Sequence, residues 1–290
     1  MSTLTDLAAP MKLVDTHVHF WNPELLGYPW LAGVPALNRA FMPGDYSAQA
    51  LLPNVEKLVF VECGCDLASG LQEARWVAGL AAIEPRLRGI VARAAVEHGA
   101  GVRKDLLALS QIPKVVGIRR NLESEKDPAF CLAPQFIAGV GELIPFDFSF
   151  DLCVRHYQLP AVIELVRRCP EVRFVLDHCG KPAIRERQLD PWRQNIRELA
   201  ALPNAECKIS GLLTEADLAD WRHADLRPVV HHVLESFGPE RVMLGSDWPV
   251  LRLAQNHERW FEALEYCLNG MTEEARGKLY RLNGEAFYRL

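Results

Sequence analysis

Two histidines and an aspartate alternate along a short apolar run near the start of the chain. In LVDTHVHFW, Asp15, His17 and His19 fall at every second position, after Leu13. Side chains of a strand alternate between its two faces, so these residues are expected to share one face. The opposite face would carry only β-branched side chains: Val14, Thr16 and Val18. Two imidazoles on one face aim their nitrogens at one point, which suits metal binding or polarisation of a carbonyl group.

Three later strand ends carry a polar side chain that the same alternation selects. In KVVGIRR it selects Arg119, in VRFVLDH it selects His178, and in RVMLGSDW it selects Asp247. A glycine two positions earlier, Gly117 or Gly245, leaves space beneath the polar residue. Imidazoles, a carboxylate and a guanidinium that meet at one rim can activate water, polarise a carbonyl and hold an oxygen-rich ligand.

Each of these residues also has a structural interpretation when it is taken alone. Histidine pairs occur in exposed strands, Asp247 can cap a turn, and Arg119 can form a surface ion pair. Their joint arrival at the ends of separate strands favours a functional site. His156, just after the expected fifth strand, stays a candidate because its direction depends on where that strand ends. The other chemically capable residues have no comparable support: His98, Lys208, His223, His231, His232 and His257.

Strands and helices alternate along the whole sequence. Runs rich in β-branched and apolar residues predict strands at 12–20, 57–63, 88–94, 114–120, 150–154, 172–178, 206–212 and 241–248. Segments of helical period predict helices at 71–82, 101–111, 160–169 and 228–237. Such alternation indicates a parallel sheet covered by helices, and eight units fit a single-domain TIM-like (β/α)8 barrel over residues 1–290. An open doubly wound sheet is the alternative, but no G-x-G-x-x-G stands at an early strand-to-helix turn.

Composition excludes several classes of function. The chain has 290 residues and a formal net charge of −5, and no basic cluster points to a nucleic-acid partner. The first residues lack a basic segment followed by a long apolar one, and no apolar run approaches the roughly 18 residues of a membrane span. We therefore expect a cytoplasmic protein without a membrane partner, and leave open a homo-oligomer. The eight cysteines are dispersed, which predicts reduced thiols, and Cys63 and Cys65 are expected to be packing residues.

These motifs resemble the amidohydrolase superfamily (amidohydrolase 2 type), and within it the sugar-lactone hydrolases such as L-fuconolactonase and L-rhamnonolactonase. The matching stretches are DTHVHFWNPELLGYPWL, GIRRNL, LDHCGKP, CKISGL, FGPERVMLGSDWPV and LNGEAFYRL, and they span nearly the whole chain. The resemblance implies a distorted (β/α)8 barrel, with His17 and His19 on the first strand, His178 after the sixth and Asp247 after the eighth. It also implies a substrate-binding arginine, Arg119, after the fourth strand.

The metal content is left open by a departure from the superfamily pattern. Many amidohydrolases carry a carboxylated lysine on the fourth strand that bridges two metals, but GIRR has no lysine there. The resemblance therefore implies either one divalent ion, with zinc expected first, or catalysis without metal. The ligands would be His17, His19 and Asp247, with His156 or His178 as a further candidate.

The mechanism that follows is hydrolysis of a lactone to the open acid by water. Asp247 is predicted to be the general base, with His178 and the first-strand histidines polarising the carbonyl. Asp15 is expected to orient His17 from behind. A sugar ring would lie against Trp21, Trp30 and Trp248, although core packing is the alternative for these aromatics. The long segment from Trp21 to Glu56 would form part of the wall or lid.

Two other functions remain open. The substrate could be a carboxylated lactone of the pyrone or muconolactone type, or an aromatic acid that is decarboxylated, in which case Arg119 would bind a carboxylate. The chain could also be an inactive barrel that binds a sugar acid. The retention of His17, His19, His178 and Asp247 argues against an inactive barrel.

Overall fold

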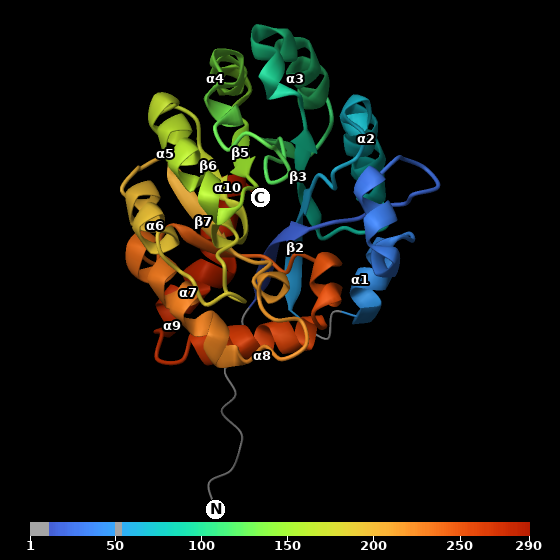
Figure 1. Ribbon diagram of the computed structural model, residues 1–290. Coiled ribbons are helices and arrows are strands. Elements are labelled where there is room, and N and C mark those ends of the chain that lie inside the picture. The colour runs from blue at the N-terminus through green and yellow to red at the C-terminus, as the bar shows by residue number, and fades with distance from the viewer. Residues whose placement is uncertain (1–11, 50–53) are drawn as a thin grey trace, which may run out of the picture.

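Eight parallel strands, each paired with the next in the chain, form a nearly closed barrel in the computed structural model (Figure 1). The structure describes residues 12–49 and 54–290, so the predictions for the first residues lie outside the described part. The strands are β1 (Leu13–Val18), β2 (Val55–Val61), β3 (Leu87–Arg93), β4 (Val115–Arg119), β5 (Ser149–Leu152), β6 (Phe174–Leu176), β7 (Ala205–Ile209) and β8 (Val242–Leu244). The predicted TIM-like (β/α)8 fold is confirmed, and each predicted strand overlaps an observed one.

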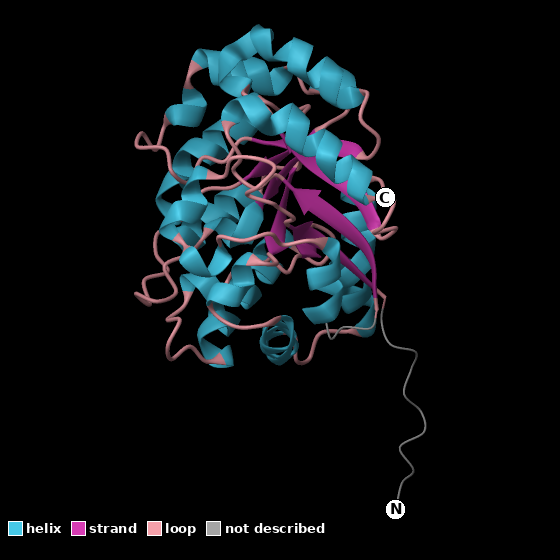
Figure 2. Cartoon of the chain, turned by 90° about the vertical axis from the view of Figure 1, so that its right-hand side faces the viewer, coloured by secondary structure: helices cyan, strands magenta, loops and turns pink. Residues whose placement is uncertain are grey.

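Helices surround the strands, as the perpendicular view shows (Figure 2). They are α1 (Pro43–Gln49), α2 (Gly70–Leu80), α3 (Arg103–Ser110), α4 (Pro134–Gly141), α5 (Leu159–Arg168), α6 (Trp192–Ala200), α7 (His223–Phe237), α8 (His257–Cys267), α9 (Glu273–Gly277) and α10 (Asn283–Tyr288). Helix α5 illustrates why they form: Pro160 stands in its first turn, and its apolar side chains fall on the face buried against the sheet.

Alternation along the strands divides the core in two. In β2, Leu58 and Phe60 pack in the main core, whereas Val59 and Val61 join a second cluster that contains Tyr288 of α10. The C-terminal residues lie at the starts of the strands, where Lys57 Nζ donates to the carbonyl of Leu290 at 3.1 Å. The chain end thus closes the end of the barrel opposite to the strand C-termini.

A few individual hydrogen bonds complete the barrel between β1 and β8, and we call this junction the seam. The strand order begins at β1 and ends at β8, with one bridge between Val18 and Trp248. Across it, Thr16 Oγ1 donates to the carbonyl of Leu244 at 2.6 Å, and the amide of Asp247 donates to the carbonyl of His17 at 2.9 Å. The seam therefore joins the segment that carries the histidine pair to the segment that carries Asp247.

Asp15 belongs to the seam and contacts His17 through the backbone, because its Oδ1 accepts from the amide of His17 at 3.2 Å; the predicted contact with the His17 ring is corrected to this one. Its carboxylate accepts from the amide of Ser246 at 2.8 Å and from the hydroxyl of Tyr46 at 3.1 Å. The pairing of β1 with β2 shifts register between Asp15 and Val18, and this irregularity breaks the simple alternation. Burial raises the pKa of Asp15 to about 6.

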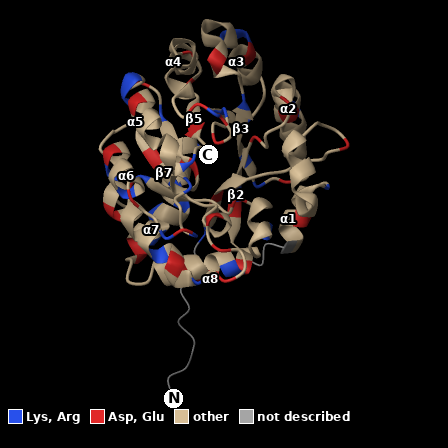
Figure 3. Cartoon of the chain, in the orientation of Figure 1, with Lys and Arg blue, Asp and Glu red and all other residues tan. Residues whose placement is uncertain are grey.

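All eight cysteines are buried, and none of them is joined to another in the structure. Among the described residues, no helix is both long and apolar enough to cross a membrane. Figure 3 shows acidic and basic residues interspersed along the outer helices.

Candidate active site

A cavity of about 300 Å³ opens among the loops that follow the strands. Such a position, at the carboxyl ends of the strands, is where barrel enzymes hold their substrates. Six of the predicted site residues line it: His19, Trp21, Trp30, Arg119, His178 and Asp247. Residues selected from the sequence therefore meet at one cavity, although His19 and Asp247 are 228 positions apart in the chain.

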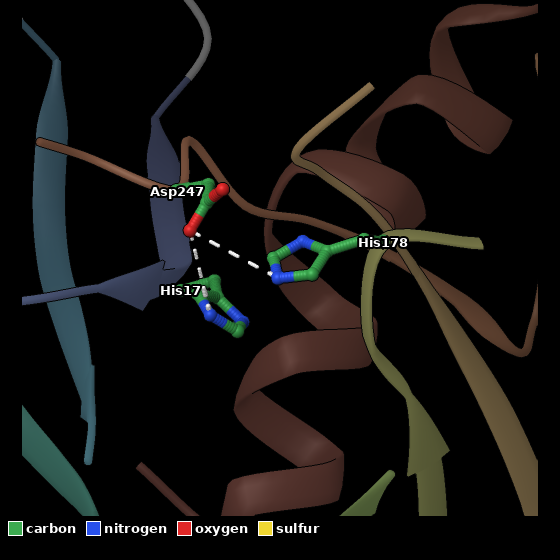
Figure 4. Close-up of side chains that lie close together, drawn as sticks. All are labelled: His17, His178 and Asp247. Carbon is green, nitrogen blue, oxygen red and sulfur yellow. Dashed lines mark ion pairs between the residues drawn. The ribbon is translucent and has the colours of Figure 1, made fainter. Parts of the chain in front are cut away.

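Three imidazoles converge on one oxygen of Asp247. Its Oδ1 atom lies 3.3 Å from Nε2 of His19, 3.8 Å from Nε2 of His17 and 3.9 Å from Nε2 of His178. Figure 4 shows His17 and His178 directed toward the carboxylate from different elements. His17 is fully buried behind this carboxylate, and the other two histidines reach the cavity.

Left-handed turns, rather than continued strands, aim two of these side chains. Strands β6 and β8 end at Leu176 and Leu244, before His178 and Asp247 are reached. His178 has φ of 54° and Asp247 has φ of 61°, a region that non-glycine residues seldom occupy. Gly211, itself at φ of 59°, lies so close that a Cβ would stand 2.5 Å from Nδ1 of His178.

The other ring nitrogen of each histidine is held by a neighbour. Nδ1 of His19 lies 2.8 Å from the carbonyl of Val61, and Nδ1 of His178 lies 2.9 Å from the hydroxyl of Ser210. Nδ1 of His17 lies 3.2 Å from the ammonium of Lys208. Such contacts fix the ring orientation and leave Nε2 to face Asp247.

The charge states follow from burial and from these neighbours. Burial lowers the pKa of His178 to about 4, and it lowers the pKa of His17 well below the ordinary value, although Asp177 opposes this. Both rings are therefore neutral near pH 7. Burial alone would raise the pKa of Asp247, but His178 and His19 outweigh it and hold the pKa below its usual value. Asp247 is thus an ionised carboxylate that can accept a proton.

Arg119 is anchored beneath the cavity by carboxylates that sequence reasoning missed. Its Nε donates to Glu62 at 2.9 Å and its Nη1 to Asp177 at 3.1 Å, and Nη2 also contacts the carbonyl of Glu62. Burial raises the pKa of Asp177, but Lys208, His17 and Arg119 hold it well below the usual range. Glu62 ends an apolar strand and Asp177 precedes His178, which are signals that could have identified both residues.

A second missed group lies deeper in the barrel. Lys208 and Asp151 are fully buried, and their Nζ and Oδ2 atoms are 2.6 Å apart. Charged residues are almost never buried unless they are paired. The position of each within an apolar strand, in ECKISGL and FDLCV, was the signal for such a pair.

Two predicted site residues lie elsewhere. Trp248 packs against Phe41 and Tyr46 and does not line the cavity, so we leave it out of the substrate wall. His156 begins a short helical turn and its ring packs against Tyr157. It does not line the cavity, and in the described part of the chain no ion pair joins it to Asp247, so we drop it as a ligand.

The donor set fits one divalent ion in spacing. A tetrahedral zinc ion with bonds of about 2 Å separates its ligand atoms by about 3.3 Å. The distances from Asp247 Oδ1 to the three Nε2 atoms, 3.3 to 3.9 Å, are close to this value. His17, His178 and Asp247 also form one of the two groups with mutually close ligand atoms.

Comparison with known proteins agrees with this fold and site. The sequence pattern of the Amidohydrolase family matches residues 14–290, and this chain belongs to that family. It is 36% identical to an L-fucono-1,5-lactonase of Burkholderia multivorans, over 86% of this chain and 88% of the relative. An L-rhamnono-gamma-lactonase of Scheffersomyces stipitis is 25% identical over 96% of this chain and 99% of its own. The predicted resemblance to the sugar-lactone branch is confirmed.

A solved structure supports the same grouping. An amidohydrolase from Burkholderia multivorans with bound zinc is 32% identical, with a TM-score of 0.86, and the match covers 96% of this chain and 99% of that one. The zinc is a feature of that protein.

Proposed function

We propose that this protein is a lactone hydrolase that opens a neutral sugar lactone to the corresponding acid. The observation that carries the proposal is the ionised carboxylate of Asp247, held among three imidazoles at the wall of a cavity. The curated lactonase relative at 36% identity supports the same class of reaction.

Asp247 is the general base in this proposal. Its carboxylate takes a proton from a water molecule, whose oxygen attacks the lactone carbonyl, and the proton then passes to the departing ring oxygen. Asp247 has a left-handed backbone conformation, and its backbone N–H donates a hydrogen bond to the carbonyl of His17. Together these two features fix the direction of the carboxylate. The same group therefore serves both halves of the reaction without moving.

His178 and Arg119 stabilise the negative charge that develops on the carbonyl oxygen. His178 lines the cavity, and in this proposal the hydroxyl of Ser210 donates to Nδ1, so that Nε2 carries the hydrogen and can donate it to that oxygen. Donors of this kind are commonly worth ~3–4 kcal/mol each in transition-state stabilisation. Arg119 contributes positive potential from a fixed position and can contact a ring oxygen or hydroxyl.

The chain offers ligands for one metal ion, although no catalytic step in the proposal depends on it. A zinc ion would be held by His17, His178 and Asp247, whose ligand atoms lie close to one another, with His19 as a further candidate, and each ligating imidazole nitrogen would then carry no hydrogen. When bound, such an ion polarises a carbonyl and lowers the pKa of water.

The charge balance of the cavity favours a neutral lactone over a carboxylated one. Four cationic residues line it, and each already pairs with a carboxylate: Arg93 with Glu62, Arg119 with Glu62 and Asp177, Arg120 with Glu97 and Glu125, and Lys181 with Glu123. A pyrone dicarboxylate or aromatic acid would have to displace these partners. A hydroxyl group of a neutral lactone can instead accept a hydrogen bond from the cation of an ion pair and donate one to its carboxylate.

Aromatic side chains supply the remaining wall. The Trp21 and Trp30 rings meet edge to face at 5.4 Å, and both line the cavity. Their indole N–H groups donate to backbone carbonyls, at 2.9 Å to Arg39 and 2.7 Å to Cys63. The orientation of the rings is thereby fixed, and their carbon surfaces can contact the C–H groups of a sugar ring.

A panel of lactones tests the proposal. We expect acid release, followed with a pH indicator, from L-fuconolactone, L-rhamnonolactone or related aldonolactones, and none from pyrone dicarboxylates or muconolactones. Turnover confined to the carboxylated lactones would contradict the proposed substrate class. Thermal stabilisation by sugar acids without turnover of any lactone would instead support an inactive binding barrel.

A further inference from the structure

Lys208 lies directly behind the candidate active site and has no place in the mechanism above. It projects from β7, is fully buried and does not line the cavity. Its ammonium donates to Asp151 Oδ2 at 2.6 Å and to His17 Nδ1 at 3.2 Å, and it forms an ion pair with Asp177 Oδ1 at 3.0 Å. It therefore joins the buried charges of the barrel to one of the site imidazoles.

The ammonium is held in this position from several sides. Asp151 Oδ2 also accepts from the hydroxyl of Tyr288 at 2.7 Å, and the ring of Tyr288 lies 5.3 Å from Nζ of Lys208. Asp177 is fixed in turn by Arg119 at 3.1 Å. A lysine so enclosed cannot turn away from His17.

This contact determines which ring nitrogen of His17 carries the hydrogen. An ammonium is only a donor, so Nδ1 of His17 must accept, and a neutral ring then carries its hydrogen on Nε2. Asp177 Oδ1 lies at a similar 3.2 Å from Nδ1, but within the described residues this oxygen has no hydrogen bond of acceptable geometry. The contact of Nε2 with Arg119, at 3.5 Å, is too long to impose the opposite arrangement.

His19 has the opposite arrangement. Its Nδ1 faces the carbonyl of Val61, which only accepts, so the hydrogen is on Nδ1 and the lone pair of a neutral ring is on Nε2. A metal ion needs that lone pair, and a protonated Nε2 cannot supply it. His19 is thus prepared as a ligand, whereas His17 is not.

We propose that Lys208 is a positioning residue that holds His17 in the Nε2–H tautomer and thereby weakens divalent-metal binding at the candidate centre that contains His17 and Asp247. This inference rests on the proposed metal centre, but not on the identity of the lactone. Without Lys208, Nδ1 of His17 can donate to the open Asp177 Oδ1, and Nε2 becomes a ligand atom. Lys208 thus favours a site that works with imidazole donors over one that depends on a metal.

The tautomer can be read directly from nitrogen–hydrogen correlation spectra of the metal-free protein labelled with ¹⁵N-histidine. His17→Gln identifies the signals of His17 by their loss. We expect the hydrogen of His17 on Nε2 in the unaltered protein and on Nδ1 in Lys208→Met. Asp177→Asn keeps Lys208, so the hydrogen should stay on Nε2. A hydrogen on Nδ1 in the unaltered protein, or no change in Lys208→Met, would overturn the proposal.

Zinc titration by calorimetry provides the second readout and needs no turnover. Partners that support a ligand are typically worth about 10- to 100-fold in metal affinity; because Lys208 opposes the ligand form of His17, we expect Lys208→Met to bind zinc at least about tenfold more tightly. Lys57→Met, which removes a positive charge at the far end of β2, should leave the affinity unchanged. Equal gains in both variants, or a gain in Lys208→Met without the tautomer change, would mean that charge alone acts and would refute the proposal.

Removal of Lys208 leaves buried carboxylates without their partner, which can prevent folding. Lys208→Met combined with Asp151→Asn removes both charges of the pair, and the hydroxyl of Tyr288 can still donate to the amide oxygen. This double variant should show the same tautomer change and the same gain in zinc affinity. A folded double variant that lacks both changes would contradict the proposal. Failure of the lactone panel, by contrast, would leave both readouts intact.

Discussion

The Oδ1 atom of Asp247 lies 3.3 Å from Nε2 of His19, across the seam between the last and the first strand of the barrel. Neither residue belongs to a regular strand, and both reach the cavity because the seam bonds set their backbones side by side. Catalysis as proposed depends on the seam, because it places the carboxylate of Asp247 at the wall of the cavity beside Nε2 of His17 and His178.

Replacement of the carboxylate tests the base directly. Asp247→Asn should lower kcat for the active lactone by a factor of about 10²–10⁴, because an amide cannot take a proton from water. Thermal unfolding should show an intact fold, and Asp220→Asn, at an exposed position, should retain full turnover. Near-normal activity of Asp247→Asn would remove this residue from the base role.

The pH dependence should reveal the buried neutral histidine. Burial lowers the pKa of His178 from 6.5 to about 4, so its neutral form persists as the pH falls below 6.5. We expect kcat/KM to stay level through this range and to decline only as the pH approaches about 4. A decline centred near 6.5 would show that the ring titrates as an ordinary histidine.

The same histidine should affect stability with a defined sign. Between pH 6.5 and about 4 the unfolded chain binds a proton at His178 that the folded chain does not. The free energy of unfolding should therefore fall as the pH is lowered through this range. His178→Gln should reduce that pH dependence, measured by urea unfolding at several pH values.

Gly211 offers a matched comparison with another glycine. Both Gly211→Ala and Gly238→Ala place a side chain at positive φ, which costs roughly 1–2 kcal/mol of stability. Only at Gly211 would the new Cβ meet the site, 2.5 Å from His178 Nδ1 and 3.1 Å from Asp247 Oδ2. Turnover should fall at least about tenfold in Gly211→Ala, since small misplacements of reacting groups are costly, and stay normal in Gly238→Ala. Equal activity of the two variants would contradict this assignment.

The seam can be weakened without any change in the cavity. Thr16→Val removes the buried bond to the carbonyl of Leu244 while it keeps the shape of the side chain, and should cost roughly 1–3 kcal/mol in the free energy of unfolding. Ser110→Ala, which removes an exposed local bond to Leu107, serves as the control and should cost much less. Chemical denaturation of both variants measures the difference.

Much of the fold and part of the site could be predicted from local patterns. Apolar runs alternating with helical segments identified the barrel, and alternation within strands selected His17 and Arg119, whose side chains lie 3.5 Å apart beside the cavity. His178 and Asp247 reach the site for a different reason, since left-handed turns beyond the strand ends direct them. Such backbone conformations leave little trace in residue types other than glycine.

Asp15 and Lys208 mark the limits of this reasoning. A register shift in β1 separates Asp15 from the histidine ring that alternation assigned to it. Lys208 meets Asp151 and His17 only when three distant strands are assembled, and no spacing in the sequence encodes that meeting. Partners of buried charges are fixed by tertiary packing, which short patterns do not contain.

The seam has a consequence for how the protein responds to heat. Elsewhere neighbouring strands are joined by backbone ladders, whereas the first and last strands share a bridge and a few separate bonds. A local opening at this join would part the carboxylate from its imidazoles while the remaining ladders stay paired. Thermal inactivation should accordingly set in at temperatures where the helical circular dichroism is still that of the native protein.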